Sequence, residues 1–329
     1  MSKCLVTTLK GIVNDEDLLK IGEFKIKVNT VDSPSNKTQG ITVRFSKNTT
    51  LTIEGNGNFT DKDLSENRGK TLNIVANTTT YVYFSNGDFN ISFPDKYSLT
   101  FLSLFAEEVG SEPTIQNKSV SIESFEFSKD IDTLRLSAEN VTGDFASVKN
   151  LSKLTALNIS KVDVYGDISA IKYLNKLTYI NMEDTSVTGD VSSIANLGSL
   201  KRFAVTNLYG DLSKLNRMTS LTELLLKKGT FYGDIAILPP TLNFLSLQYD
   251  NGSTLTWSKR PSSSTIFSIE GSPKVSNIDK MLQDLAACQT PSTEQAIKVI
   301  SATGKRTSAS DSAVSALQSK GYTVTIISL

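Results

Sequence analysis

The sequence predicts an α/β solenoid of parallel strands and short helices, preceded by a small antiparallel all-β domain and closed by a small α/β cap. An apolar-x-Gly-Asp motif recurs five times, with its glycines 23, 23, 21 and 23 residues apart. A second apolar pattern keeps step with this motif, and alternating apolar and polar residues mark the chain before it. We therefore expect domains at residues 1–92, 93–290 and 291–329.

The second pattern has the form L-x-x-L-x-L and occurs six times between residues 131 and 250. It reads Ile131-x-x-Leu134-x-Leu136, Leu154-x-x-Leu157-x-Ile159, Leu177-x-x-Ile180-x-Met182, Leu200-x-x-Phe203-x-Val205, Leu221-x-x-Leu224-x-Leu226 and Leu242-x-x-Leu245-x-Leu247. With its period of 21–23 residues, it resembles the leucine-rich-repeat family. We expect weaker turns at 97–104, 122–127 and 266–269.

The Gly-Asp pair of each repeat suits a turn that leads into a helix. Gly permits a tight turn, and Asp stands where a helix N-cap belongs, ahead of apolar residues at helical spacing. An Asp ladder could instead bind calcium, but one carboxylate per turn is a thin ligand set for that ion. We expect helix caps at Asp144, Asp167, Asp190, Asp211 and Asp234.

The last part of the chain departs from the repeat. Pro239-Pro240 predicts an extended connection in place of a helical end. A helix over 277–286 follows, with Asn277 as its cap. We expect a strand at 296–301, a helix at 308–319 that stops at Gly321, and a strand at 322–327, which together cover the open end of the core.

The chain before residue 92 has short alternating strands separated by turn residues, which indicates antiparallel β structure. The segments 46–60 and 76–90 are alike, because both run from Asn-Thr-Thr through a strand into a Gly-Asn or Gly-Asp turn. This similarity predicts a duplicated hairpin.

The composition argues against several functions. Lys+Arg and Asp+Glu balance at 34 each, which disfavours nucleic-acid and membrane-surface binding. Histidine is absent, and the two cysteines, Cys4 and Cys288, are expected to be unrelated free thiols. No apolar run suits a transmembrane helix or signal peptide, so we expect synthesis in a cytoplasm without general secretion. We predict no enzyme activity, cofactor or metal.

The residues between the inward leucines are expected to form columns on the concave face of the solenoid. One column holds Tyr179, Arg202, Glu223 and Phe244 in neighbouring turns, and aromatic residues and Arg are enriched at binding hot spots. The next two columns contain Asn158, Asn181 and Lys227, which complete the predicted site. The alternative is that Arg202 pairs with Glu223 only to satisfy an exposed sheet. The pattern does not discriminate a protein ligand from a glycan.

Three segments resemble virion fibre or appendage proteins of Bacteroides phages, including crAss-like phages. They are MSKCLVTTLKGIVNDEDLLKIGEFKIKV, NISFPDKYSLTFLSL and GKRTSASDSAVSALQSKGYTVTI. The resemblance implies a virion structural protein (fibre, appendage, or capsid or tail decoration) whose N-terminal domain docks on other virion proteins. It also implies a homo-oligomer, for which we expect a trimer, and a solenoid that binds a host-surface protein or glycan. The alternatives are a leucine-rich-repeat adhesin at a bacterial cell surface and, less favoured, a glycan-degrading enzyme.

Overall fold

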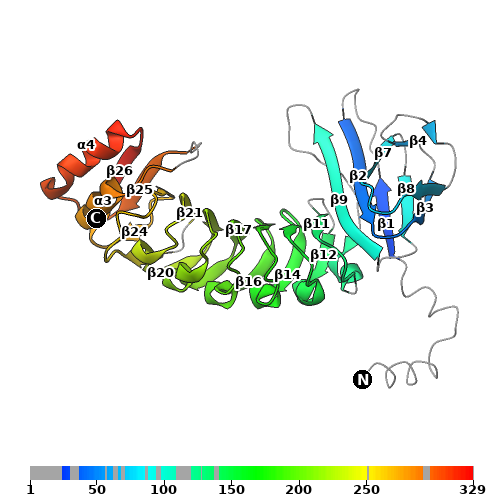
Figure 1. Cartoon of the computed structure of the whole chain (residues 1–329), viewed down its shortest axis with the longest axis horizontal. Helices are drawn as coiled ribbons and strands as arrows, with labels where there is room; N and C mark the ends of the chain where they lie inside the picture. The colour runs from blue at the N-terminus through cyan, green and yellow to red at the C-terminus, as the bar shows by residue number, and fades with distance from the viewer. Residues whose placement is uncertain are drawn as a thin grey trace, which may run out of the picture.

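The computed structural model describes residues 24–29, 37–55, 58–61, 66–67, 71–85, 88–93, 98–108, 120–126, 128–136, 141–249, 252–291 and 297–328. Parallel strands lie side by side in a curved array, with antiparallel strands at one end and helices α3 and α4 at the other (Figure 1). Residues 1–23, which hold Cys4 and most of the first segment that resembles phage proteins, lie outside the described part.

The L-x-x-L-x-L segments form one parallel sheet on the inner side of the curve (Figure 1). In each strand the leucine positions are buried and the residues between them face outward from the core. This register is that of a leucine-rich-repeat solenoid. The six repeat strands are β11 Thr133–Leu136, β13 Ala156–Asn158, β15 Tyr179–Met182, β17 Arg202–Thr206, β19 Glu223–Lys227 and β21 Phe244–Gln248. The same sheet continues at its two ends through β9 Leu99–Glu108, β23 Ser268–Glu270, β25 Val299–Thr303 and β26 Thr323–Ile327.

The Gly-Asp motifs form a second parallel sheet on the outer side of the curve (Figure 1). Its strands are β10 Val120–Ser121, β12 Val141–Asp144, β14 Asp163–Asp167, β16 Ser186–Asp190, β18 Leu208–Asp211, β20 Thr230–Asp234, β22 Thr254–Thr256 and β24 Lys274–Val275. Short 3-10 helices lead back from it, namely η2 Ile122–Phe125, η3 Phe145–Asn150, η4 Ile168–Ile171, η5 Val191–Ile194, η6 Leu212–Arg217 and η7 Ile235–Ile237. The apolar core lies between these elements and the inner sheet.

The predicted aspartate caps are confirmed, although the helices are 3-10 rather than α. Each of the five carboxylates accepts a hydrogen bond from the backbone N–H two residues later, at 2.8–3.0 Å. In the last of them, Asp234 also accepts a bond from the backbone N–H of Ser258 in the following turn. These bonds satisfy N–H groups that a helix start leaves without partners.

In four of the five motifs the glycine lies close to the aspartate of the preceding turn, whereas Gly143 in the first motif lies over Ser121. Gly166 and Gly210 have φ of +128° and +122°, a conformation that L side chains rarely adopt. A Cβ on Gly166 would lie 2.9 Å from Oδ1 of Asp144, and a Cβ on Gly210 would lie 2.5 Å from Oδ1 of Asp190. The motif therefore needs glycine for its backbone and also for the space that the previous cap occupies.

The predicted hairpins are wrong. β3 Thr49–Gly55 and β4 Asn58–Asp61 do not pair with each other; β3 pairs with β8 Asp88–Phe93, and β4 pairs with β7 Thr80–Ser85. Each of the two similar segments, 46–60 and 76–90, therefore passes from one antiparallel sheet to the other. The strands of one segment pair with the strands of the other in both sheets. The remaining strands are β1 Phe24–Asn29, β2 Lys37–Phe45, β5 Glu66–Asn67 and β6 Thr71–Ile74.

The antiparallel pairing continues past residue 92. β9 pairs with β2 in antiparallel fashion and with β11 in parallel fashion, so it belongs to both parts of the chain. Arg44 on β2 reinforces this junction through an ion pair with Asp132 at 2.7 Å. The domain limits at residues 92 and 290 stay predictions.

Pro239-Pro240 ends η7 early, as predicted, and Leu238 before it is extended at ψ 156°. A buried arginine compensates for the lost helical turn. Arg260, 2% exposed, donates to the carbonyl oxygens of Ala236, Leu238 and Pro239 at 3.1–3.2 Å. Burial lowers the pKa of this guanidinium.

The C-terminal elements are α3 Ile278–Ala287, η8 Ser308–Ser310 and α4 Asp311–Ser319. The prediction that the side chain of Asn277 caps α3 is wrong, because it makes no hydrogen bond to the start of the helix. Asn277 stands at the N-cap but has φ of +59°, and its side chain donates to the carbonyl oxygen of Trp257 instead. β25 and β26 extend the inner sheet. The expectation that the C-terminal elements cover the open end of the core stays a prediction.

We expect Gly210→Ala to destabilise the solenoid by about 1–3 kcal/mol, because alanine is strained at this φ. Its methyl group would also displace the Asp190 cap. Gly198→Ala is the matched control, because no heavy atom lies within 4 Å of its Cβ position. Urea unfolding of both variants measures the difference. Equal effects of the two substitutions would show that the contact between turns contributes little.

Candidate binding surface

The register of the inner sheet places the predicted residues as the sequence suggested. Tyr179, Arg202, Glu223 and Phe244 occupy four consecutive strands as direct Cα partners. Neighbouring parallel strands lie about 4.8 Å apart, so this column is continuous. Asn158 and Asn181 are partners in the second column, and Lys227 lies between Thr206 and Gln248 in the third. Ser137, which the repeat spacing places first in that column, lies outside the described residues.

Arg202 and Glu223 form an ion pair across adjacent strands. Their side chains remain 34% and 39% exposed, so water screens the attraction between them. The charges at the centre of the first column therefore neutralise each other, as expected from the alternative that Arg202 pairs with Glu223 only to satisfy an exposed sheet.

The third column is also paired. Nζ of Lys227 lies 2.9 Å from Oε1 of Glu183, and this hydrogen bond raises the pKa of Lys227 above its usual value. Farther along, Oε2 of Glu270 accepts hydrogen bonds from Ser246 at 2.7 Å and Gln248 at 2.9 Å. The inner face thus holds its polar groups in bonds between strands.

The two predicted asparagines stabilise the turns that follow their strands. Oδ1 of Asn158 accepts from the backbone N–H and the hydroxyl of Ser160 at 3.3 and 3.0 Å. Oδ1 of Asn181 accepts from the N–H of Glu183 at 3.2 Å. Such bonds are typical of Asx turns, which gives both residues a local role. Their part in binding stays a prediction.

Apolar side chains remain partly exposed around the paired charges. Tyr179 lies on one side of the Arg202–Glu223 pair and Phe244 on the other, with Leu225 beside Glu223 on β19. Because the charges are already paired, these three side chains form the part of the inner face that gains most from leaving water.

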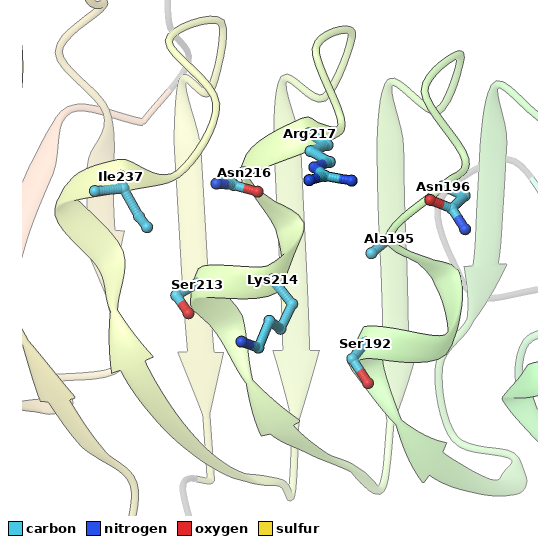
Figure 2. Close-up of a pocket in the computed structure, with 8 residues that line it drawn as sticks. All are labelled: Ser192, Ala195, Asn196, Ser213, Lys214, Asn216, Arg217 and Ile237. Carbon is cyan, nitrogen blue, oxygen red and sulfur yellow. The ribbon is translucent and has the colours of Figure 1, made fainter.

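Sequence reasoning missed a groove of about 450 Å³ on the outer side. It lies between the turns of η5, η6 and η7 and is lined by Ser192, Ala195, Asn196, Ser213, Lys214, Asn216, Arg217 and Ile237 (Figure 2). Alignment of the helical segments could have found it, because Ala195 stands where two earlier turns carry Lys149 and Lys172.

Among the described residues, no helix has the length and hydropathy to cross a membrane. The same residues contain no group of three or more His, Cys, Asp or Glu side chains placed to hold a metal ion. Cys288 is buried and free, and burial raises the pKa of its thiol.

No protein-family model and no curated protein matches the sequence. Solved leucine-rich-repeat structures are similar in fold. An internalin C2 from Listeria monocytogenes is 18% identical over 42% of this chain and 71% of its own, with a TM-score of 0.32. The leucine-rich-repeat ectodomain of a plant membrane receptor kinase from Arabidopsis thaliana is 14% identical, with a TM-score of 0.44 over 64% of this chain and 26% of its own. A leucine-rich-repeat protein of Leptospira interrogans is 14% identical over 62% of both chains, with a TM-score of 0.30.

We expect the Arg202–Glu223 pair to contribute less than about 1 kcal/mol to stability, because both side chains are partly solvated. A double-mutant cycle of Arg202→Ala and Glu223→Ala, measured by urea unfolding, gives the coupling energy. A value well above this range that persists in high salt would contradict the prediction.

Proposed function

We propose that the chain is a non-catalytic binding module whose inner face takes a protein partner. The arrangement of Tyr179, Leu225 and Phe244 around the Arg202–Glu223 pair carries the proposal. The aromatic side chains supply contact area, and the paired charges avoid the cost of burying an unpaired ion. A rigid parallel sheet holds these groups in place, which keeps the entropy cost of binding low.

The double variant Arg202→Ala/Phe244→Ala should weaken partner binding by at least about tenfold while nearly preserving the melting temperature. Lys172→Ala/Tyr173→Ala is the matched control, because it removes one cation and one aromatic ring from the outer side, where Tyr173 is 76% exposed. Quantitative affinity capture with the wild type and both variants makes the comparison. Equal losses in both variants, or none, would reject the inner face as the site.

We further propose that this module is part of a phage particle, with the N-terminal antiparallel strands docked on other virion proteins as a trimer. The sequence resemblance given above is the support for this proposal. Mass spectrometry of purified particles from the source phage should detect the chain at structural abundance. Its absence from particles, with recovery in the envelope fraction of a bacterium, would favour the adhesin alternative.

A further inference from the structure

On the outer side of the solenoid, the aspartates and the basic side chains occupy different parts of each turn. The segments 145–155, 168–178, 191–201 and 212–222 run from the first four aspartate caps to the next inner strand and contain cations but no Asp or Glu. Their cations, all exposed, are Lys149, Lys153, Lys172, Lys176, Lys201, Lys214 and Arg217. The whole chain has a formal net charge of zero, so this concentration is local.

Helix electrostatics explains only part of this pattern. Cations in the last turn of a helix stabilise its negative end, which accounts for Lys149, Lys214 and Arg217. Lys176 and Lys201 lie five or more residues beyond the 3-10 helix of their turn, where the effect has faded. The outer side also carries the motif aspartates, of which Asp167 is exposed, and Lys153 forms an ion pair with Asp130 at 2.6 Å. The remaining cations form local positive strips between the aspartates, and an anionic ligand supplies a reason for these strips.

The groove includes two of these cations, Lys214 and Arg217, in its lining and depends on two changes in the repeat. Ala195 replaces the lysine of the two earlier turns, and η7 has only three residues because Pro239 follows soon after it. Figure 2 shows Arg217 extended toward the turn that carries Ala195 and Asn196, whereas Asn216 points toward Ile237. The small side chain of Ala195 thus lines the groove at the position where the two earlier turns carry a lysine.

The lining of the groove combines one available guanidinium with neutral hydrogen-bonding groups. Nζ of Lys214 lies 3.6 Å from the Asp211 carboxylate, so its charge is partly offset. Arg217 has no ion pair among the described residues. The amides of Asn196 and Asn216 and the hydroxyl of Ser192 complete the polar lining.

We propose that this groove binds a carboxylated sugar of an acidic polysaccharide. The planar guanidinium of Arg217 matches a carboxylate in a two-bond geometry. The amides and hydroxyls suit the hydroxyls of the sugar ring, and Lys172, Lys176 and Lys201 would follow the chain over the neighbouring turns. The lining residues include no aromatic ring, although binding of single-stranded nucleic acid relies on base stacking. This site lies on the opposite side from the proposed protein surface and does not depend on it.

Biolayer interferometry of the full chain with polygalacturonate tests the proposal, with dextran, polyglutamate and single-stranded DNA as comparison ligands. Polygalacturonate should bind, more weakly as salt rises, and better than the other three. Arg217→Ala should reduce its affinity at least about tenfold, as expected for loss of a charged two-bond contact. Arg135→Ala, which removes an exposed cation from the inner face, should leave it unchanged.

The substitution Ala195→Lys tests whether binding depends on the shape of the groove or only on positive charge. Residue 195 ends its helix at φ −59° and ψ −17°, and Lys172 occupies the equivalent place at φ −55° and ψ −20°, so the backbone accepts lysine. The substitution adds a cation but fills the groove, and it should lower polygalacturonate affinity while preserving the melting temperature. Unchanged or tighter binding by this variant, equal binding of polyglutamate or DNA, or no binding of polygalacturonate would each overturn the proposal.

Discussion

The contact between a motif glycine and the aspartate of the turn before it, which recurs at four of the five motifs, determines the form of the solenoid. One carboxylate caps its own 3-10 helix and also fills the space that the next glycine leaves by having no Cβ. The cap fixes where the helix starts, and this position turns the following apolar residue inward, as in Leu212 after Asp211. Because the contact joins two turns, no repeat can change this motif alone, and stability depends on neighbouring pairs of turns.

The solenoid built on this glycine–aspartate contact has two surfaces whose charged side chains are arranged differently. On the inner face the main charges are paired between strands, as in Arg202 with Glu223 and Lys227 with Glu183. On the outer side the aspartates are used at the helix starts, while the cations gather in the segments that follow. The inner face therefore offers apolar contact area, whereas the outer side offers positive charge and a polar groove.

The inner columns could be predicted from the sequence because the apolar pattern and its period alone determine which side chains are neighbours. The aspartate caps could be predicted because Gly-Asp precedes apolar residues at a fixed distance. The partner strands of β3 and of β4 could not be predicted, because alternation shows which face of a strand is buried but not which strand lies beside it. Asn277 has a typical capping side chain, but its left-handed backbone turns that side chain toward Trp257. The groove could not be predicted either. It depends on the difference in size between Ala195 and Lys172, and their equivalence becomes clear only when both are known to end a 3-10 helix.

The buried core explains how one short repeat can support two separate surfaces. Phe203 and Leu200, both fully buried, lie between the strand that carries Arg202 and the outer segment that carries Ala195. Protein interiors are close-packed, so such residues hold both surfaces in fixed positions. The side chains at Arg202 and Arg217 project into water on opposite sides and share no contact in the described structure. Each surface can therefore change its residues without disturbing the other, provided that the glycine and the aspartate of each turn are kept.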